Sequence, residues 1–350
     1  MNKDPLRIEQ YATVLFNANL NPLGIPDTVK SSIKDNIDSI VHYPDIYYNK
    51  LRTAVAEYTG VPINQVVMGN GSTDLLKLFS SLVTPKKALL LTPGPTEYEV
   101  VLTAYNTELV FFELKEEDEF TLDVDQLIKA LTDDLDMLIL SNPNNPTSKK
   151  VEVADIRKLA AACKDKNIFL MVDEMYIEFL DNPEDYTSIP LVKEFDNMTV
   201  LRSVSKFFAV PGLRFAYAII NNPAQKQIID LITTKNNIAS LSAIAITNMF
   251  KDTDYIEHSR SVVHTERSLV YLAMSTSKTI KLYRPDANFM LFKLLRDDLT
   301  ASDVALHCNK RGIILRKCDD IRSLDNKYIR ICFMNPKQND LMVNTILEIV

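Results

Sequence analysis

The chain has 350 residues, of which 46% are hydrophobic and 24% charged, the ordinary balance of a globular protein with one or two domains. This composition excludes a disordered or collagen-like chain, and no apolar run approaches the roughly 20 residues that span a bilayer. A formal net charge of −7 argues against nucleic acid as the main partner. The four scattered cysteines form no CxxC pair, and the first residues carry no signal-peptide core, so we expect a cytoplasmic protein.

Residues 1–25 are predicted to form an extended arm, because FNANLNPLG is too rich in Asn and Pro for regular structure. Between residues 26 and 240, short apolar runs alternate with helical stretches, which is typical of a mostly parallel α/β sheet. After residue 240 the pattern changes to a long helical stretch followed by short strands, which predicts a smaller α+β domain over 241–350. The predicted strands are 65–68, 87–92, 135–140, 167–173, 198–204, 215–220, 288–294, 312–317 and 327–333.

Polar segments follow several of the predicted strands of the larger domain. Open α/β sheets bind ligands at the carboxyl ends of their strands, so these segments are the candidate site. They are GNGSTD (69–74), SNPNNPT (141–147), DEMY (173–176) and the serine-rich turn that leads to Lys206.

Lys206 follows two serines at a strand end, with Arg214 eight residues further on. A lysine becomes a nucleophile when its amine is neutral, which burial and nearby positive charge promote. The alternative is a solvated surface lysine, which is the commoner case.

The other segments each allow two interpretations. GNGSTD lies between a strand and a helix, where backbone N–H groups with Ser72 and Thr73 form an anion site, or where they simply cap the helix. Asp173 is a carboxylate at a strand end that needs a positive partner, such as a protonated heterocyclic nitrogen, unless it is an N-cap. SNPNNPT offers asparagine amides, or is a plain Asn/Pro turn.

The ordered set NPNNPT, DxxY, SxSK and GLR resembles the fold-type I pyridoxal-phosphate enzymes of the class I/II aminotransferase superfamily. More narrowly, it resembles the branch of histidinol-phosphate aminotransferases and threonine-phosphate decarboxylases. FNANLNPLG, HYPD, GNGSTDLL, KFFAVPGLR, DANFMLF and GIILR support it, so the resemblance runs from about residue 14 to the end. It implies an α/β fold whose large domain has a mostly parallel seven-stranded sheet between helices, plus a smaller α+β domain.

The resemblance also implies roles for individual residues, with pyridoxal 5′-phosphate as cofactor and no metal. Lys206 holds the cofactor as an internal aldimine and moves the substrate α-proton, and Asp173 pairs with the pyridinium nitrogen. Asn145 and Tyr176 hydrogen-bond the ring 3-oxygen, while Tyr98 stacks on the ring. The phosphate is held by Ser72, Thr73, Ser203, Ser205 and Arg214, joined by Tyr43 from the partner subunit of a homodimer with shared active sites.

For the substrate, Arg330 in KYIRICF matches an arginine that grips the α-carboxylate in bidentate fashion. Arg316 in GIILR matches one that contacts a substrate phosphate, with a surface strand charge as the alternative. Asn19 in the arm is expected to cover the site. The four histidines are scattered and are interpreted as structural or surface residues.

The resemblance implies an aminotransferase of the histidinol-phosphate type, which moves an amino group between an amino acid or phosphorylated amine and a 2-oxo acid. The alternative is a decarboxylase of threonine O-3-phosphate or phosphoserine. DEMYIEF resembles the aminotransferases, whereas KFFAVPGLR and FNANLNPLG are closer to the decarboxylases. A third possibility is a cofactor-binding regulator, but only about 25 residues precede the domain, where such regulators carry a helix-turn-helix segment. Ser148 stands where relatives usually carry glycine.

Overall fold

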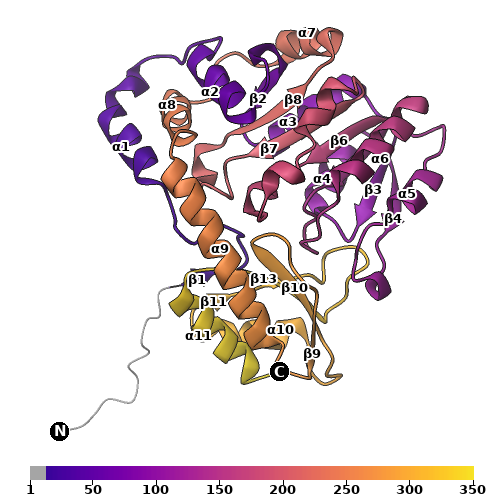
Figure 1. Cartoon of the computed structure of the whole chain (residues 1–350), viewed down its shortest axis with the longest axis vertical. Coiled ribbons are helices and arrows are strands. Elements are labelled where there is room, and N and C mark those ends of the chain that lie inside the picture. The colour runs from indigo at the N-terminus through magenta and orange to yellow at the C-terminus, as the bar shows by residue number, and fades with distance from the viewer. Residues whose placement is uncertain (1–12) are drawn as a thin grey trace.

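The computed structural model describes residues 13–350, and its two larger sheets lie in the upper and lower parts of the molecule as drawn (Figure 1). The first half of the predicted arm, residues 1–12, lies outside the described residues. The larger sheet has seven strands in the order β2-β8-β7-β6-β5-β3-β4. These strands are β2 Val66–Gly69, β3 Lys87–Thr92, β4 Glu108–Glu113, β5 Met137–Ser141, β6 Phe169–Asp173, β7 Met198–Ser203 and β8 Ala216–Ile220.

Helices cover both faces of this sheet, because successive side chains along each buried strand point to opposite faces and both sets are apolar. One set, exemplified by Leu90 and Met171, packs with the apolar sides of α3, α4 and α7. The other, exemplified by Leu89 and Val172, packs with α2, α5 and α6. These helices are α2 Asn49–Thr59, α3 Ser72–Val83, α4 Thr96–Ala104, α5 Val124–Lys129, α6 Val153–Asp165 and α7 Pro223–Ile232.

The predicted seven-stranded α/β sheet is confirmed, with two differences in detail. Strand β8 runs antiparallel to both neighbours, β2 and β7, so one strand of the mostly parallel sheet is reversed. Strand β4, which the sequence analysis did not predict, occupies the edge beside β3. Its ends are exposed glutamates and its middle is only half-buried, so it lacks the apolar run that marks the inner strands.

The smaller sheet has the strand order β12-β13-β10-β9 and packs with α9 and α11 at the lower end of the molecule (Figure 1). Its strands are β9 Ile280–Leu282, β10 Phe289–Leu294, β12 Arg316–Lys317 and β13 Tyr328–Cys332, and its helices are α9 Thr253–Met274, α10 Ala301–Asn309 and α11 Pro336–Leu347. The single strand predicted over 312–317 is divided at Leu315. Its first half, β11 Ile313–Ile314, pairs with β1 Val14–Leu15 of the arm.

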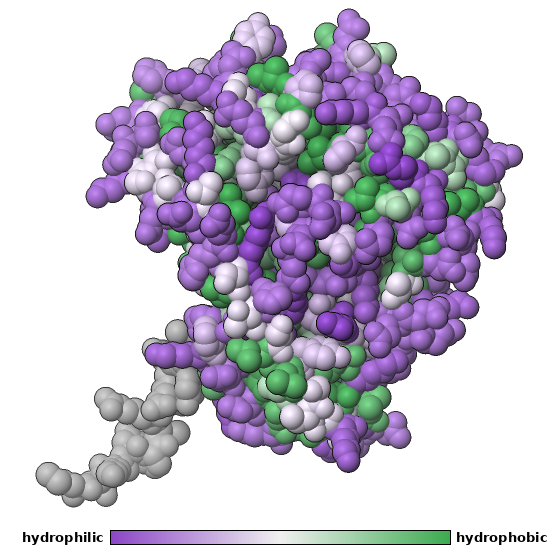
Figure 2. Space-filling view, viewed as in Figure 1, coloured by the Kyte–Doolittle hydropathy of each residue, from purple (hydrophilic) through white to green (hydrophobic). Residues whose placement is uncertain are grey.

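The division into residues 26–240 and 241–350 stays a prediction. Helix α8 (Ser240–Met249) packs on α1 (Asp27–Asp35) and α2, and α9 then continues toward the smaller sheet (Figure 1). The face drawn in Figure 2 is mostly hydrophilic, with apolar residues scattered over it. Among residues 13–350, no helix is both long and apolar enough to cross a membrane.

Candidate active site

A single cavity at the carboxyl ends of β5, β6 and β7 is lined by most of the predicted site residues. The central strands β6 and β7 of the larger sheet lead to the carboxylate and the lysine, while β12 and β13 of the smaller sheet carry two arginines. The predicted residues on its wall are Ser72, Thr73, Tyr98, Asn145, Asp173, Tyr176, Ser205, Lys206, Arg214, Arg316 and Arg330.

One end of the cavity is built to receive an anion. Ser72 and Thr73 are the first two residues of α3, so free backbone N–H groups and the positive end of the helix dipole lie there beside two hydroxyls. Gly71, with φ +92°, lies against the Arg214 guanidinium, and a Cβ at this position would collide with it. Glycine therefore leaves room for the arginine as it is placed here, and it adopts this positive φ without strain.

Ser203 lies one step behind the cavity wall. Its Oγ is 2.8 Å from Oγ of Ser205, which does line the cavity, and it donates to the Phe215 carbonyl at 3.3 Å. Ser203 therefore supports Ser205.

Asp173, the last residue of β6, is a buried carboxylate. Its Oδ2 accepts a hydrogen bond of 2.6 Å from the Tyr98 hydroxyl, and its Oδ1 accepts one of 2.9 Å from the Met175 amide. Burial raises the pKa of Asp173 to about 6, since the charged form is poorly solvated there. A cationic partner would restore the ionised form.

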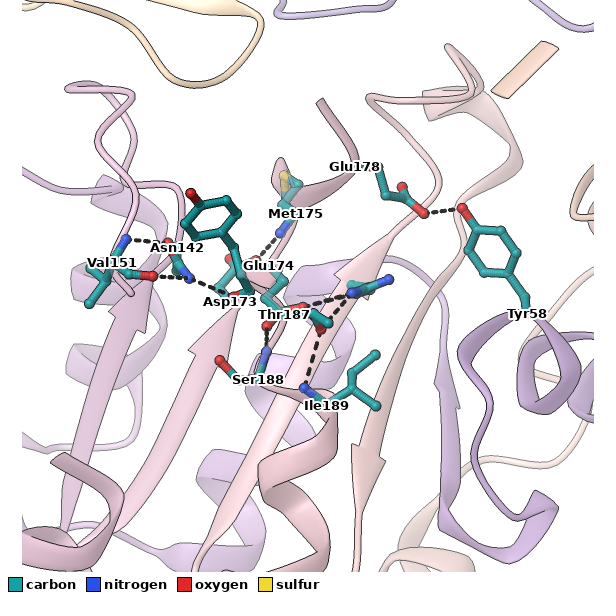
Figure 3. Close-up of polar contacts among 12 residues, drawn as sticks. Tyr58, Asn142, Val151, Asp173, Glu174, Met175, Glu178, Thr187, Ser188 and Ile189 are labelled. Carbon is teal, nitrogen blue, oxygen red and sulfur yellow. Dashed lines mark hydrogen bonds and ion pairs between the residues drawn. The ribbon is translucent and has the colours of Figure 1, made fainter. Parts of the chain in front are cut away.

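The next residue, Glu174, does not line the cavity and holds the end of β6 through its buried carboxylate (Figure 3). Its fully buried carboxylate accepts from Arg202 Nε at 3.0 Å and from Thr187 Oγ1 at 2.8 Å, and it also accepts from the Ser188 amide. Because Arg202 belongs to β7, this ion pair joins the strand that ends in Asp173 to the strand that leads to Lys206.

Lys206 reaches across to the arm, where its Nζ donates to the Ala18 carbonyl at 2.9 Å. Burial lowers the pKa of Lys206, and the positive charges of Arg330 and Arg214 lower it further. The structure thus provides both conditions that favour a neutral, nucleophilic amine.

Arg330 projects from the middle of β13 into the same space. Its Nη1 donates to Asn145 Oδ1 and its Nη2 donates to the Asn17 carbonyl at 2.7 Å. Tyr176 packs edge-on against Phe289, with ring centroids 4.8 Å apart. Burial raises the pKa of Tyr176, so its hydroxyl keeps its proton.

Arg316 lines the cavity from β12 and is held by its own loop. Its Nη2 donates to Asp320 Oδ2 at 2.8 Å and its Nη1 to the Lys317 carbonyl at 2.5 Å. These two bonds leave three of the five guanidinium N–H groups for other partners.

Besides Ser203, two further predicted residues do not line the cavity in this chain. Asn19 is fully buried behind the wall, where its Nδ2 donates to the Tyr176 hydroxyl at 3.3 Å. Tyr43 is 88% exposed on the outer surface, so any contact with a site would be with that of another chain.

The sequence analysis missed Asn17 and Glu97, which both line the cavity. Ser148 keeps the left-handed conformation that glycine adopts easily, with φ +64°, and its Oγ accepts from the Ala287 amide at 2.8 Å. Serine at position 148, where relatives usually carry glycine, therefore keeps the backbone conformation after NPNNPT. It also bonds this segment to the residues before β10.

The sequence profile described as aminotransferase class I and II matches residues 12–346. The threonine-phosphate decarboxylase of Salmonella typhimurium is 32% identical over 98% of this chain and 95% of its own length. The structure of histidinol-phosphate aminotransferase from Clostridium acetobutylicum superposes with a TM-score of 0.89 at 28% identity, covering 96% of this chain and 98% of the other. That of the Sinorhizobium meliloti enzyme, in complex with pyridoxal 5′-phosphate, gives a TM-score of 0.86 at 20% identity, covering 100% and 96% of the chains, which shows the shared fold.

The fold and the cavity define a pyridoxal-phosphate enzyme of fold type I. The chain belongs to the class I and II aminotransferase family, and within it the relatives include both aminotransferases and decarboxylases. Pyridoxal 5′-phosphate is the cofactor of this family and of this chain.

The residues present fit that cofactor. A phosphate fits the anion site beside Gly71, where the Arg214 guanidinium occupies the space that a Cβ would take. A protonated ring nitrogen suits the buried carboxylate of Asp173, and an aldehyde suits the amine of Lys206 with its lowered pKa. The three groups lie on the wall of one cavity, as a single elongated ligand requires.

Proposed function

We propose that this enzyme is an aminotransferase, which moves an amino group between an amino acid or phosphorylated amine and a 2-oxo acid. The observation that carries the proposal is the position of Arg330. Its guanidinium is fixed by Asn145 and the Asn17 carbonyl, and it lines the same cavity as Lys206. An arginine in this position is suited to hold a substrate carboxylate in a fixed orientation beside the amine.

The proposed roles follow from the chemistry of each side chain. The cofactor supplies an electron sink for the electron pair released when a bond to the substrate α-carbon breaks. Ser72, Thr73, Ser205 and Arg214 would hold its phosphate, with Ser203 supporting Ser205, and Asp173 would hold the ring nitrogen. Lys206 would carry the cofactor and then move a proton at the α-carbon, while Asn145, Tyr176 and Tyr98 would hold the ring.

Retention of the carboxylate is the reason for preferring transamination. Arg330 would hold the substrate carboxylate in place, so that it stays on the substrate while the cofactor supplies the electron sink. The α-hydrogen is then the group presented to Lys206. Arg316 lines the cavity from the smaller sheet. We propose that it binds a second anionic group of the substrate, such as a phosphate.

The second candidate is decarboxylation of an O-phospho amino acid. The specific observation in its favour is the 32% identity to a threonine-phosphate decarboxylase over nearly the whole length of both chains. In this case Arg330 and Arg316 would together hold the phosphate, and the carboxylate would be free to leave as CO2.

We also propose a homodimer with shared sites. Tyr43 lies in a segment whose apolar side chains are turned outward, with Ile40 68% and Val41 76% exposed. Contiguous exposed apolar side chains of this kind are typical of an interface. A partner seated on this segment would bring Tyr43 to its cofactor phosphate.

A single-turnover experiment tests the proposed reaction. The cofactor-loaded enzyme is mixed with O-phospho-L-threonine, O-phospho-L-serine or histidinol phosphate, without any 2-oxo acid. One carbonyl product per site without CO2 supports transamination. Continuing release of CO2 supports the decarboxylase instead. If no compound gives a carbonyl product or CO2, the proposed binding of a substrate phosphate by Arg316 is contradicted.

A further inference from the structure

Three consecutive residues of the arm each contact a different functional side chain. The Asn17 carbonyl accepts from Arg330 at 2.7 Å, the Ala18 carbonyl accepts from Lys206 at 2.9 Å, and Asn19 donates to the Tyr176 hydroxyl at 3.3 Å. The arm therefore forms a wall of the active site.

The arm is fixed in this position on both sides. Just before Asn17, β1 pairs with β11, and the Phe16 carbonyl accepts from the Cys332 amide at 2.9 Å. Just after it, the Asn19 carbonyl accepts from Asn288 Nδ2 at 3.0 Å. Because the backbone is held at both ends, the side chain of Asn17 is presented in a defined place.

The carboxamide of Asn17 has no structural task among the described residues. Its Oδ1 is buried and unpaired, whereas its amide nitrogen is not among the buried unpaired atoms. Asn17 nevertheless lines the cavity, so its amide N–H groups are the donors that it can offer to a ligand.

The neighbouring Arg330 also keeps donors for a ligand. Of its five N–H groups, one is taken by Asn145 and one by the Asn17 carbonyl. The guanidinium of Arg330 is bonded to the Asn17 carbonyl, and both residues line the cavity, so one anionic group there could accept from both side chains.

We propose that Asn17 is a substrate-binding residue, whose carboxamide donates to the same carboxylate or phosphate that Arg330 holds. The inference rests on the proposed role of Arg330 as an anion-binding residue. It assigns to Asn17 the contribution that the sequence pattern suggested for Asn19, and it makes the arm a determinant of substrate affinity.

The test is a rapid-mixing titration of the cofactor-loaded enzyme, in which the absorbance change of the cofactor that precedes product formation gives the dissociation constant of the amino compound. Asn17→Ala keeps the backbone carbonyl that holds Arg330 and removes only the carboxamide. Asn17→Asp places a negative charge beside the bound anion. Asn309→Ala, an exposed asparagine at the end of α10, is the matched control.

We expect Asn17→Ala to raise the dissociation constant about tenfold, the size of a lost hydrogen bond to a charged group. Asn17→Asp should raise it about 100-fold, because repulsion adds to the loss. Cofactor affinity, melting temperature and the control should not change. Equal effects of the two substitutions, or effects confined to melting temperature and cofactor affinity, would show a structural role and overturn the proposal.

Three probes identify the anion beside Asn17. L-Glutamate carries only carboxylates, O-phosphoethanolamine only a phosphate, and O-phospho-L-serine both. Loss of affinity for glutamate assigns the carboxylate, and loss for O-phosphoethanolamine assigns the phosphate. If none of the three shifts the spectrum of the unaltered enzyme, the anion site itself is contradicted. Since binding alone is measured, a failure here is distinct from a failure of the proposed transamination, which the reaction products test.

Discussion

The Tyr98 hydroxyl lies 2.6 Å from Asp173 Oδ2 and donates a hydrogen bond to it inside the active-site cavity. Tyr98 stands in the first turn of α4 and Asp173 at the end of β6, so the bond joins a helix to the sheet beneath it. Burial raises the pKa of Asp173 to about 6, and this hydrogen bond opposes the rise by stabilising the carboxylate. The tyrosine thus helps to keep Asp173 ionised.

Tyr98→Phe should weaken cofactor binding more at pH 6 than at pH 8. Loss of the hydrogen bond raises the pKa of Asp173 further, so a smaller fraction is ionised near pH 6, whereas at pH 8 the carboxylate is ionised in both proteins. We expect about a tenfold higher dissociation constant for pyridoxal 5′-phosphate at pH 6, measured by absorbance. Tyr105→Phe, at the other end of α4, is the control. A loss that does not vary with pH would contradict this role.

Asp173→Asn should stabilise the apoprotein at pH 7. The folded pKa of about 6 exceeds the ordinary value of 3.8, so ionisation of Asp173 costs stability as the pH rises through that window. At 1.36 kcal/mol per pH unit, the asparagine variant should be up to about 3 kcal/mol more stable at pH 7 and equal to the unaltered protein at pH 3. Urea unfolding at both pH values measures the difference. If the asparagine variant is more stable by the same amount at pH 7 and pH 3, the raised pKa of Asp173 is refuted.

Gly71→Ala should damage the anion cradle. The backbone at Gly71, with φ +92°, is costly for a side chain, and the new Cβ would displace the Arg214 guanidinium. We expect a loss of about 1–3 kcal/mol in unfolding free energy and weaker cofactor binding. Gly60→Ala has a similar φ of +69° but open space around the Cβ, so it should lose stability without losing cofactor affinity. Equal cofactor affinity in both variants would contradict the cradle.

Glu116 ties the loop after β4 to the smaller sheet. Its carboxylate accepts from Lys293 and Tyr283 at 2.8 Å, from Tyr328 at 2.7 Å and from Lys281 at 3.0 Å. Although burial alone would raise its pKa, hydrogen bonds led by that of Lys293 lower the pKa of Glu116 to about 2. The ionised carboxylate is therefore the form that the folded protein stabilises.

Glu116→Gln should destabilise the protein by about 1–3 kcal/mol at pH 7, an amount reduced for the partial exposure of the side chain. Because the folded pKa is depressed, this stability is present above pH 4.5 and is lost as the pH falls toward 2. The difference between variant and unaltered protein should thus shrink in acid, as followed by urea unfolding. Glu117→Gln, on an exposed neighbour, is the control. A difference that stays constant down to pH 2 would contradict the argument.

The functional residues at the carboxyl ends of the larger sheet could be predicted from the sequence, because the neighbouring residues in the chain mark each strand end. Several functional residues of the larger domain lie at the end of a buried strand or shortly after it, as Asp173 ends β6 and Lys206 follows β7. The carboxyl ends of parallel strands meet at one edge, so these residues had to converge.

The role of the arm could not be predicted in the same way. Asn17 and Arg330 are 313 residues apart, and neither lies at the end of a strand in the larger sheet. Tertiary contacts such as the pairing of β1 with β11 bring them together, and a two-residue strand has no recognisable periodicity. The reversal of β8 is likewise set by tertiary pairing, since its apolar run reads alike in both directions.

The fate of the substrate α-hydrogen tests the proposed reaction most directly. The cofactor-loaded enzyme is incubated in D2O with O-phospho-L-serine, and the recovered compounds are analysed by mass spectrometry, with Lys206→Ala as the control. The account predicts that the amino acid exchanges its α-hydrogen for deuterium and keeps its carboxyl carbon, and that Lys206→Ala does neither exchange nor transfer. An amine that retains the α-hydrogen, gains one deuterium and appears together with CO2 would contradict transamination and establish decarboxylation.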